Sequence, residues 1–124
     1  MEDKGERPDK TLKKVLVFTG ESFGYGDPVI GYESLATALE VLVRRKEGLP
    51  TAIVCLNTAV SIVAEDSPMV PRLKILEERG VEIMAGRFCV NEMGLTNKIA
   101  VGKVKTITEI MDFLLRSDVD VISF

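Results

Sequence analysis

Apolar residues along the chain form short runs that alternate with segments of helical spacing. Lys14 to Thr19, Thr51 to Leu56 and Val81 to Ala85 are short and mostly apolar, which is typical of strands covered on both faces of a sheet. Ala100 to Lys105 predicts a short fourth strand. Val119 to Phe124 begins by alternating valine with aspartate, which predicts a last strand that is less buried.

The longest segment of helical spacing begins at Asp27 and Pro28, an N-cap acceptor followed by a proline suited to the first turn. This helix is expected to extend to Lys46 and to end before Gly48. Its core-facing residues are expected to be Leu35, Leu39, Leu42 and Val43.

Two shorter helices are predicted further along the chain. One begins at Ser67 and Pro68, or at Pro71, and is capped by Gly80. Its core-facing residues are expected to be Leu73, Ile75 and Leu76. The other opens with a capping box from Thr106 to Glu109. Its apolar face is expected to consist of Ile107, Ile110, Met111 and Leu114.

Two further segments leave alternatives open. Asn57 to Asp66 predicts a short buried helix or a turn, and Cys89 to Asn97 predicts a loop or a short helix. The resulting order, β-α-β-α-β-β-α-β, predicts an α/β domain with a mainly parallel sheet and helices on both faces. Residues 1–10 mix both charge signs with Gly5 and Pro8 and predict a flexible tail, so residues 11–124 are expected to form a single domain.

Composition narrows the classes of function. The net charge is -3 and no basic stripe is present, so nucleic-acid binding has no support. No apolar run is long enough to span a membrane, and the charged N-terminus does not resemble a signal peptide, so we expect a cytoplasmic protein. A hydrophobic content of 46% predicts an efficiently filled core or an apolar face covered by another subunit, and we expect a homo-oligomer.

Cys89 is the leading candidate for chemistry, because it follows the predicted strand that ends at Ala85. Ligands of open α/β sheets gather at the carboxyl ends of the strands. The chain has no histidine, so a reactive Cys89 would depend on backbone amides or on Lys and Arg, with Arg87 and Asn91 nearby. Asn57 ends the second predicted strand and should reach the same region, although it is also suited to satisfying backbone groups at the turn.

Cys55 lies within a strand and is expected to be a core residue. Two cysteines at unrelated positions suggest neither a disulfide framework nor a zinc site, and no metal or cofactor is expected.

The glycine-rich loop at Gly24, Gly26 and Asp27 lies where a phosphate-binding loop would be found, between a strand and a helix. It matches neither the Walker pattern nor the dinucleotide fingerprint, in which Val29 replaces the third glycine. The loop therefore either provides positive φ angles and a helix cap, or binds an anion or a small ligand.

Several segments taken together resemble the DsrE/DsrF-like family, closest to the C-terminal domain of YedF-type proteins of sulfur and selenium metabolism. The matching residues are Val15-Leu16-Val17, Gly24-Tyr25-Gly26-Asp27 with Ile30-Gly31, Asn57, Val60, Ser67-Pro68, Leu76 to Ile83, Cys89, Gly94-Leu95 and Ala100 to Val104. The resemblance implies a three-layer α/β/α fold with a five-stranded parallel sheet, and trimers or hexamers. It also implies a cysteine that carries sulfur as a persulfide, here Cys89.

Two departures from the family pattern bear on mechanism. Many YedF-like domains have a Cys-Gly-Thr-Cys run where this chain has Gly86 to Cys89, so an internal disulfide relay is not expected. No TusA-like domain precedes the matching region, so a partner protein of that kind would donate or accept the sulfur. Phe88 and Met93 are expected to form an apolar wall around Cys89.

The leading hypothesis is thus a sulfur carrier or sulfurtransferase that uses Cys89. The alternatives are an oligomer that binds a small ligand or anion non-covalently, and a partner-binding subunit of a sulfur-relay complex.

Overall fold

Five strands form one fully parallel sheet in the computed structural model, which describes residues 12–124. The strands are β1 (Lys13–Phe18), β2 (Ala52–Cys55), β3 (Glu82–Gly86), β4 (Lys103–Lys105) and β5 (Val119–Ser123). Their order across the sheet is β4-β3-β2-β1-β5, and every neighbouring pair is parallel. The predicted fold class is therefore confirmed, whereas the tail predicted at residues 1–10 lies outside the described residues.

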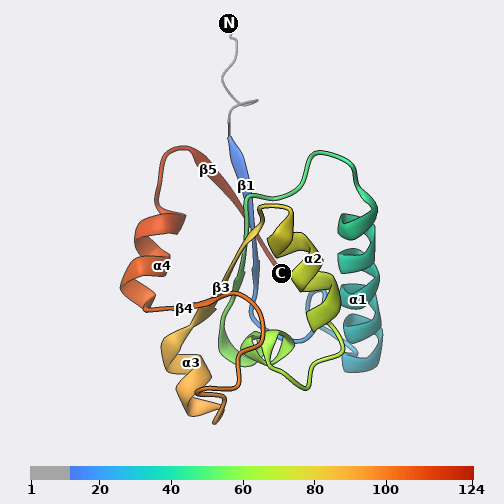
Figure 1. Ribbon diagram of the computed structural model, residues 1–124, viewed down its shortest axis with the longest axis vertical. Coiled ribbons are helices and arrows are strands. Elements are labelled where there is room, and N and C mark those ends of the chain that lie inside the picture. The colour runs from blue at the N-terminus through green and yellow to red at the C-terminus, as the bar shows by residue number, and fades with distance from the viewer. Residues whose placement is uncertain (1–11) are drawn as a thin grey trace, which may run out of the picture.

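Helices cover both faces of this sheet (Figure 1). α1 (Pro28–Arg44) and α2 (Val70–Glu78) lie on one side, and α4 (Ile107–Leu114) lies on the other. The 3-10 helix η2 (Asn57–Val63) and α3 (Arg87–Glu92) follow β2 and β3 directly, at the carboxyl edge of the sheet. None of the helices within residues 12–124 is long and apolar enough to cross a membrane.

The core has two parts, one on each face of the sheet. The larger one packs α1 and α2 against the sheet through leucines that are fully buried, namely Leu35, Leu39, Leu73 and Leu76. The smaller one lies under α4 and consists of Val15, Val17, Ala52, Val54, Met84 and Ile110. Ile110 is the α4 residue that is fully buried there, and Phe113 and Leu114 pack beside it.

Three residues expected in the core are instead exposed. Ile75 on α2 is 41% exposed, and Ile107 and Met111 on α4 are 58% and 43% exposed. A helix that packs against a sheet buries only one stripe of its surface. On α4 the buried stripe consists of Ile110 with Phe113 and Leu114 beside it, and Ile107 and Met111 lie outside it.

Element boundaries differ from the predictions where the backbone leaves regular geometry. α2 begins at Val70 with Pro71 in its first turn, which confirms the second of the two predicted starts. α1 ends at Arg44, two residues before the predicted Lys46. β4 begins only at Lys103, because the Ala100 N–H donates to Val63 O and Gly102 has a φ of 84°.

We expect Gly102→Ala to destabilise the protein strongly. A Cβ at residue 102 would lie 2.7 Å from the carbonyl oxygen of Ile83, and its φ of 84° is unfavourable for residues with a side chain. Strain and overpacking together predict a loss of about 2–4 kcal/mol in the free energy of unfolding.

Denaturant unfolding measures this effect, with Gly80→Ala as the matched control. Gly80 also has a positive φ, of 98°, but a Cβ there would meet nothing within 4 Å. Strain alone predicts a loss of about 1 kcal/mol for that variant. Equal losses in the two variants would show that the close approach to Ile83 has no energetic consequence.

Thr106→Ala tests the predicted capping box, which the structure contains. The Glu109 N–H donates to Thr106 Oγ1 over 3.1 Å, and the Thr106 N–H donates to Glu109 Oε1 over 2.8 Å. The backbone N–H and the hydroxyl of Thr106 both donate to the Glu109 carboxylate, and these two hydrogen bonds lower the pKa of that carboxyl below its usual range. Loss of the cap predicts a decrease of about 0.5–2 kcal/mol in stability.

In thermal unfolding, Thr106→Ser should keep most of this stability, and Thr108→Ala, at an exposed position in the same turn, should change little. A Thr106→Ser variant as unstable as Thr106→Ala would contradict the capping role.

Candidate functional site

Cys89 lies in the first turn of α3, immediately after β3. Gly86 joins the two elements and is itself a close-packed position. A Cβ on Gly86 would lie 2.9 Å from Leu56 Cδ2 and 3.6 Å from Cys89 Sγ. The absence of a side chain at residue 86 therefore allows the cysteine and the end of β2 to approach each other. Cys89 remains partly exposed, whereas Cys55 is fully buried.

The sulfur of Cys89 accepts a hydrogen bond from the backbone N–H of Asn57, over 3.1 Å. Asn57 adopts a left-handed conformation with a φ of 53°, which asparagine tolerates better than most residues. The prediction that Asn57 reaches the region of Cys89 is thus confirmed, through its backbone. A fixed N–H dipole aimed at sulfur is a partner suited to a thiolate in a chain without histidine.

A cavity of about 500 Å³ opens beside Cys89. Its walls come from the ends of three neighbouring strands: β2, β3 and β4. The residues that line it are Leu56, Gly86, Arg87, Phe88, Cys89, Asn91, Thr106 and Ile107. Phe88 and Ile107 are large apolar residues that are 74% and 58% exposed. The cavity is therefore mainly apolar, with one thiol in its wall.

Arg87 and Asn91 line the cavity together with Cys89, as the sequence placed them. The Asn91 Oδ1 accepts a hydrogen bond of 2.7 Å from the Thr96 hydroxyl, which fixes the amide. Met93, expected as part of the apolar wall, does not line the cavity, because α3 ends at Glu92 and Met93 follows as its C-cap. Leu56 and Ile107 supply that wall together with Phe88.

Sequence reasoning missed Leu56, Thr106 and Ile107 as site residues. Each follows the carboxyl end of β2 or β4, the two neighbours of β3. Residues after the carboxyl ends of parallel neighbours share one edge of a sheet, so this position was the available signal.

Cys55 has the environment of a core residue, as predicted. It is fully buried in β2, and burial raises the pKa of its thiol to about 12. A neutral, enclosed thiol of this kind is chemically inert.

The glycine-rich loop forms a separate hollow over the ends of β1 and β5. Gly24 and Gly26 have φ angles of 92° and 139°, as expected for a loop that needs glycine. The hollow has a volume of about 260 Å³, and no residue lines both it and the cavity of Cys89. Gly24, Gly26 and Asp27 therefore do not line the cavity beside Cys89.

Asp27 acts as the helix cap of α1. Its Oδ1 accepts hydrogen bonds of 2.9 and 3.0 Å from the N–H groups of Val29 and Ile30. Those are amides that a bound anion would use at a helix start. Phe124 anchors the loop from the other side by stacking between Phe18 and Phe23, at centroid distances of 4.9 and 4.6 Å.

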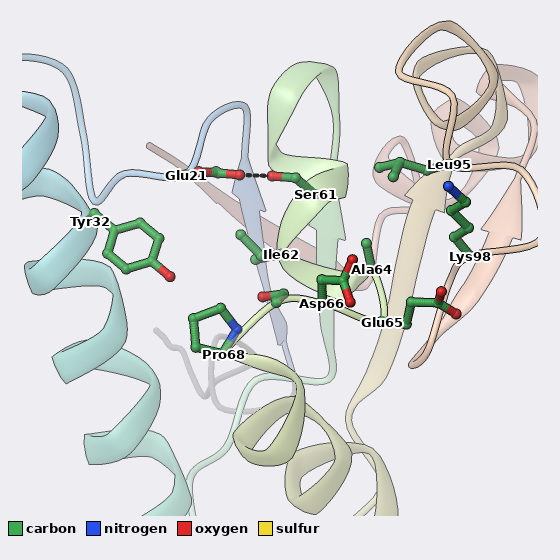
Figure 2. A pocket seen from close by; sticks show the side chains of 11 residues that line it. Glu21, Tyr32, Ser61, Ile62, Ala64, Glu65, Asp66, Pro68, Leu95 and Lys98 are labelled. Carbon is green, nitrogen blue, oxygen red and sulfur yellow. Dashed lines mark hydrogen bonds between the residues drawn. The ribbon is translucent and has the colours of Figure 1, made fainter.

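A third hollow, of about 320 Å³, lies between the start of α1, η2 and the segment after α3, and its lining mixes carboxylates with apolar side chains (Figure 2). Figure 2 shows Glu21 hydrogen-bonded to Ser61, with Tyr32 on one side and Leu95 and Lys98 on the other. Within residues 12–124, no group of three or more Cys, Asp or Glu residues is arranged to hold a metal ion. We therefore assign no metal chemistry to these carboxylates.

Three solved structures share the fold of this chain. Protein MTH1491 from Methanobacterium thermoautotrophicum, of unknown function, matches with a TM-score of 0.66 and 14% sequence identity, over 91% of this chain and 99% of that one. The ychN protein from E. coli matches with a TM-score of 0.66 and 18% identity, over 91% and 100%. Protein BT1422 from Bacteroides thetaiotaomicron, also of unknown function, matches with a TM-score of 0.60 and 16% identity, over 90% and 95%.

No protein-family model matches the chain, and no curated protein matches it in sequence. The structural likeness establishes the fold, an α/β domain with a five-stranded parallel sheet, which is the fold that the resemblance to DsrE-like proteins implies.

Proposed function

We propose that this protein is a sulfur carrier that holds a sulfane sulfur on Cys89 as a persulfide. The observation that carries the proposal is a partly exposed thiol in the wall of an apolar cavity, with a backbone N–H directed at its sulfur. A carrier needs a thiolate that can attack, a wall that shields the terminal sulfur, and an opening for the acceptor. The site of Cys89 is suited to all three.

Loading consists of one exchange step. The Cys89 thiolate attacks the outer sulfur of a persulfide donor, R–S–SH, so that a new S–S bond forms to Cys89 as the donor S–S bond breaks. The donor leaves as the thiolate R–S⁻, and the outer sulfur keeps its proton. Delivery is the same exchange with an acceptor thiolate, and Cys89 is then the leaving group. No net oxidation or reduction occurs in either direction.

The proposed role includes a place in a sulfur or selenium relay in the cytoplasm, as the resemblance to YedF-type proteins implies. A TusA-like protein is the proposed donor or acceptor. Support for partner binding comes from the exposed apolar side chains that border the cavity, Phe88 and Ile107.

We also propose that the protein acts as a homo-oligomer, a trimer or a hexamer. α4 exposes Ile107 and Met111, its C-cap Leu115 continues this spacing of four residues, and α1 exposes Val29, Ile30 and Val41. Apolar residues repeated along one side of a helix favour coverage by another chain.

Non-covalent anion binding at the glycine-rich loop is the weaker candidate. The N–H groups of Val29 and Ile30 already bind Asp27, so the start of α1 offers fewer donors to a ligand. The third candidate, a scaffold role as a partner-binding subunit of a sulfur-relay complex, requires no chemistry at Cys89.

The test of the carrier function is uptake and release of sulfur by the purified protein. Incubation with inorganic polysulfide should add the mass of one sulfur atom to the intact protein, and an added thiol should remove it. Intact-mass spectrometry measures both steps. A protein that gains no sulfur while it remains folded would exclude the carrier function and favour the scaffold role.

A further inference from the structure

The cavity beside Cys89 is much larger than the proposed cargo. A single sulfur atom occupies a volume similar to that of a water molecule, about 30 Å³. The cavity of about 500 Å³ is therefore more than ten times larger than one sulfur. Its volume lies within the range of small-molecule sites, roughly 300–1,000 Å³. The excess space is large enough to hold the body of the molecule that brings the sulfur.

The walls of the cavity define the chemistry of that body. Leu56, Phe88 and Ile107 offer apolar contacts from three different elements. Phe88 and Ile107 expose most of their surface to the cavity and to solvent, so covering them with an apolar ligand is favourable. The capping box at Thr106 fixes the start of α4 and thereby the position of Ile107. These walls are suited to an aliphatic or aromatic body.

The charge of the lining is positive. Arg87 is the charged residue among those that line the cavity, and no carboxylate lines it. The nearby Glu109 carboxylate accepts hydrogen bonds from the backbone N–H and the hydroxyl of Thr106. An anionic group on the ligand would therefore find a cation in the wall without a competing carboxylate there.

We infer that Cys89 takes its sulfur from a low-molecular-weight organic persulfide whose apolar body fills this cavity and whose anionic end lies against Arg87. This inference rests on the proposed carrier function and names its substrate class. The step is the exchange described above: a bond forms between Cys89 Sγ and the outer sulfur as the donor S–S bond breaks. The donor leaves as a thiolate whose apolar body ends in a second anionic group.

Three persulfides test the inference by their rates of sulfur transfer to Cys89. The persulfide of 6-mercaptohexanoate has a longer apolar body than that of 3-mercaptopropionate, and the persulfide of cysteamine replaces the carboxylate of the latter with an amine. We expect the longer carboxylate donor to react on the order of tenfold faster than the shorter one. The shorter carboxylate donor should react several-fold faster than the amine donor, roughly the effect of one partly exposed charge pair.

Matched variants connect each preference to one wall of the cavity. Ile107→Gln should reduce the preference for the longer body, whereas Ile75→Gln, at an exposed position of α2 outside the cavity, should leave it unchanged. Arg87→Gln should abolish the preference for the carboxylate, whereas Lys74→Gln on α2 should not. In Cys89→Ser, calorimetry should detect 6-mercaptohexanoate binding more tightly than 3-mercaptopropionate, which reports the cavity without the chemistry.

The outcomes separate the two proposals. Equal rates for the three donors, or preferences that persist in Ile107→Gln and Arg87→Gln, would overturn the inference. If Cys89 still accepted sulfur from inorganic polysulfide, the carrier function would stand, and the cavity would be assigned to a protein donor. If Ile107→Gln instead dissociated an oligomer and changed no rate, the cavity wall would be a subunit interface, and the inference would again fail. If no donor loaded Cys89, inorganic polysulfide included, the carrier function itself would fail.

Discussion

Cys89→Ser is expected to abolish sulfur uptake, whereas Cys55→Ser leaves uptake intact. A serine hydroxyl is not ionised at neutral pH and forms no stable bond with sulfane sulfur, so removal of the nucleophile should reduce uptake at least about 100-fold, to background. Serine keeps an acceptor for the Asn57 N–H, so the local fold should survive. Intact-mass measurements on both variants after exposure to polysulfide provide the comparison.

Alkylation of the folded protein offers an independent control for the same prediction. Iodoacetamide should modify Cys89, which is partly exposed, and should spare Cys55, which is fully buried and has a thiol pKa raised to about 12. Cys55 should react only in a denaturant that unfolds the protein. A Cys89→Ser variant that is folded and still gains one sulfur would refute the role of Cys89 in carriage.

Ile110→Ala is expected to cause a large loss of stability. Ile110 is fully buried and packs against Val15, Val54 and Met84 on the face of the sheet that α4 covers. Deleting most of a buried isoleucine removes its hydrophobic contribution and leaves a cavity, which together cost about 2–5 kcal/mol. For a domain of this size the melting temperature should fall by about 10 °C or more.

Met111→Ala is the matched control for this prediction. Met111 is the next residue of the same helix but is 43% exposed, so its truncation should cost less than about 1 kcal/mol. Thermal and denaturant unfolding of both variants measure the difference. Comparable losses would mean that α4 does not bury the stripe centred on Ile110, or that Met111 is covered by another subunit.

The fold could be predicted from the sequence because local pattern and overall architecture agree. Apolar runs predicted β1, β2 and β3, and the capping box predicted the start of α4. The errors arose where the length or the buried face of an element depends on a neighbouring segment. The predicted strand from Ala100 was too long because Gly102 takes a positive φ angle, and the face of α4 was misjudged because a single helix on that face buries only one stripe.

The candidate site was predictable only in part, because its residues come from three strand ends. Cys89, Arg87 and Asn91 belong to one short segment and were found together. Leu56 and Ile107 join them only because β2 and β4 flank β3, and the order of strands in a parallel sheet is not contained in the pattern of any one strand. The glycine-rich loop lies over β1 and β5 and forms a separate hollow.

The most direct test of the carrier function is peptide mapping of the protein after exposure to a persulfide donor. After alkylation and digestion, the peptide with Cys89 should carry one additional sulfur between the cysteine and the alkyl group, and the peptide with Cys55 should carry none. An unmodified Cys89 peptide, or additional sulfur on Cys55 alone, would contradict the assignment of sulfur carriage to the cavity at the ends of β2, β3 and β4.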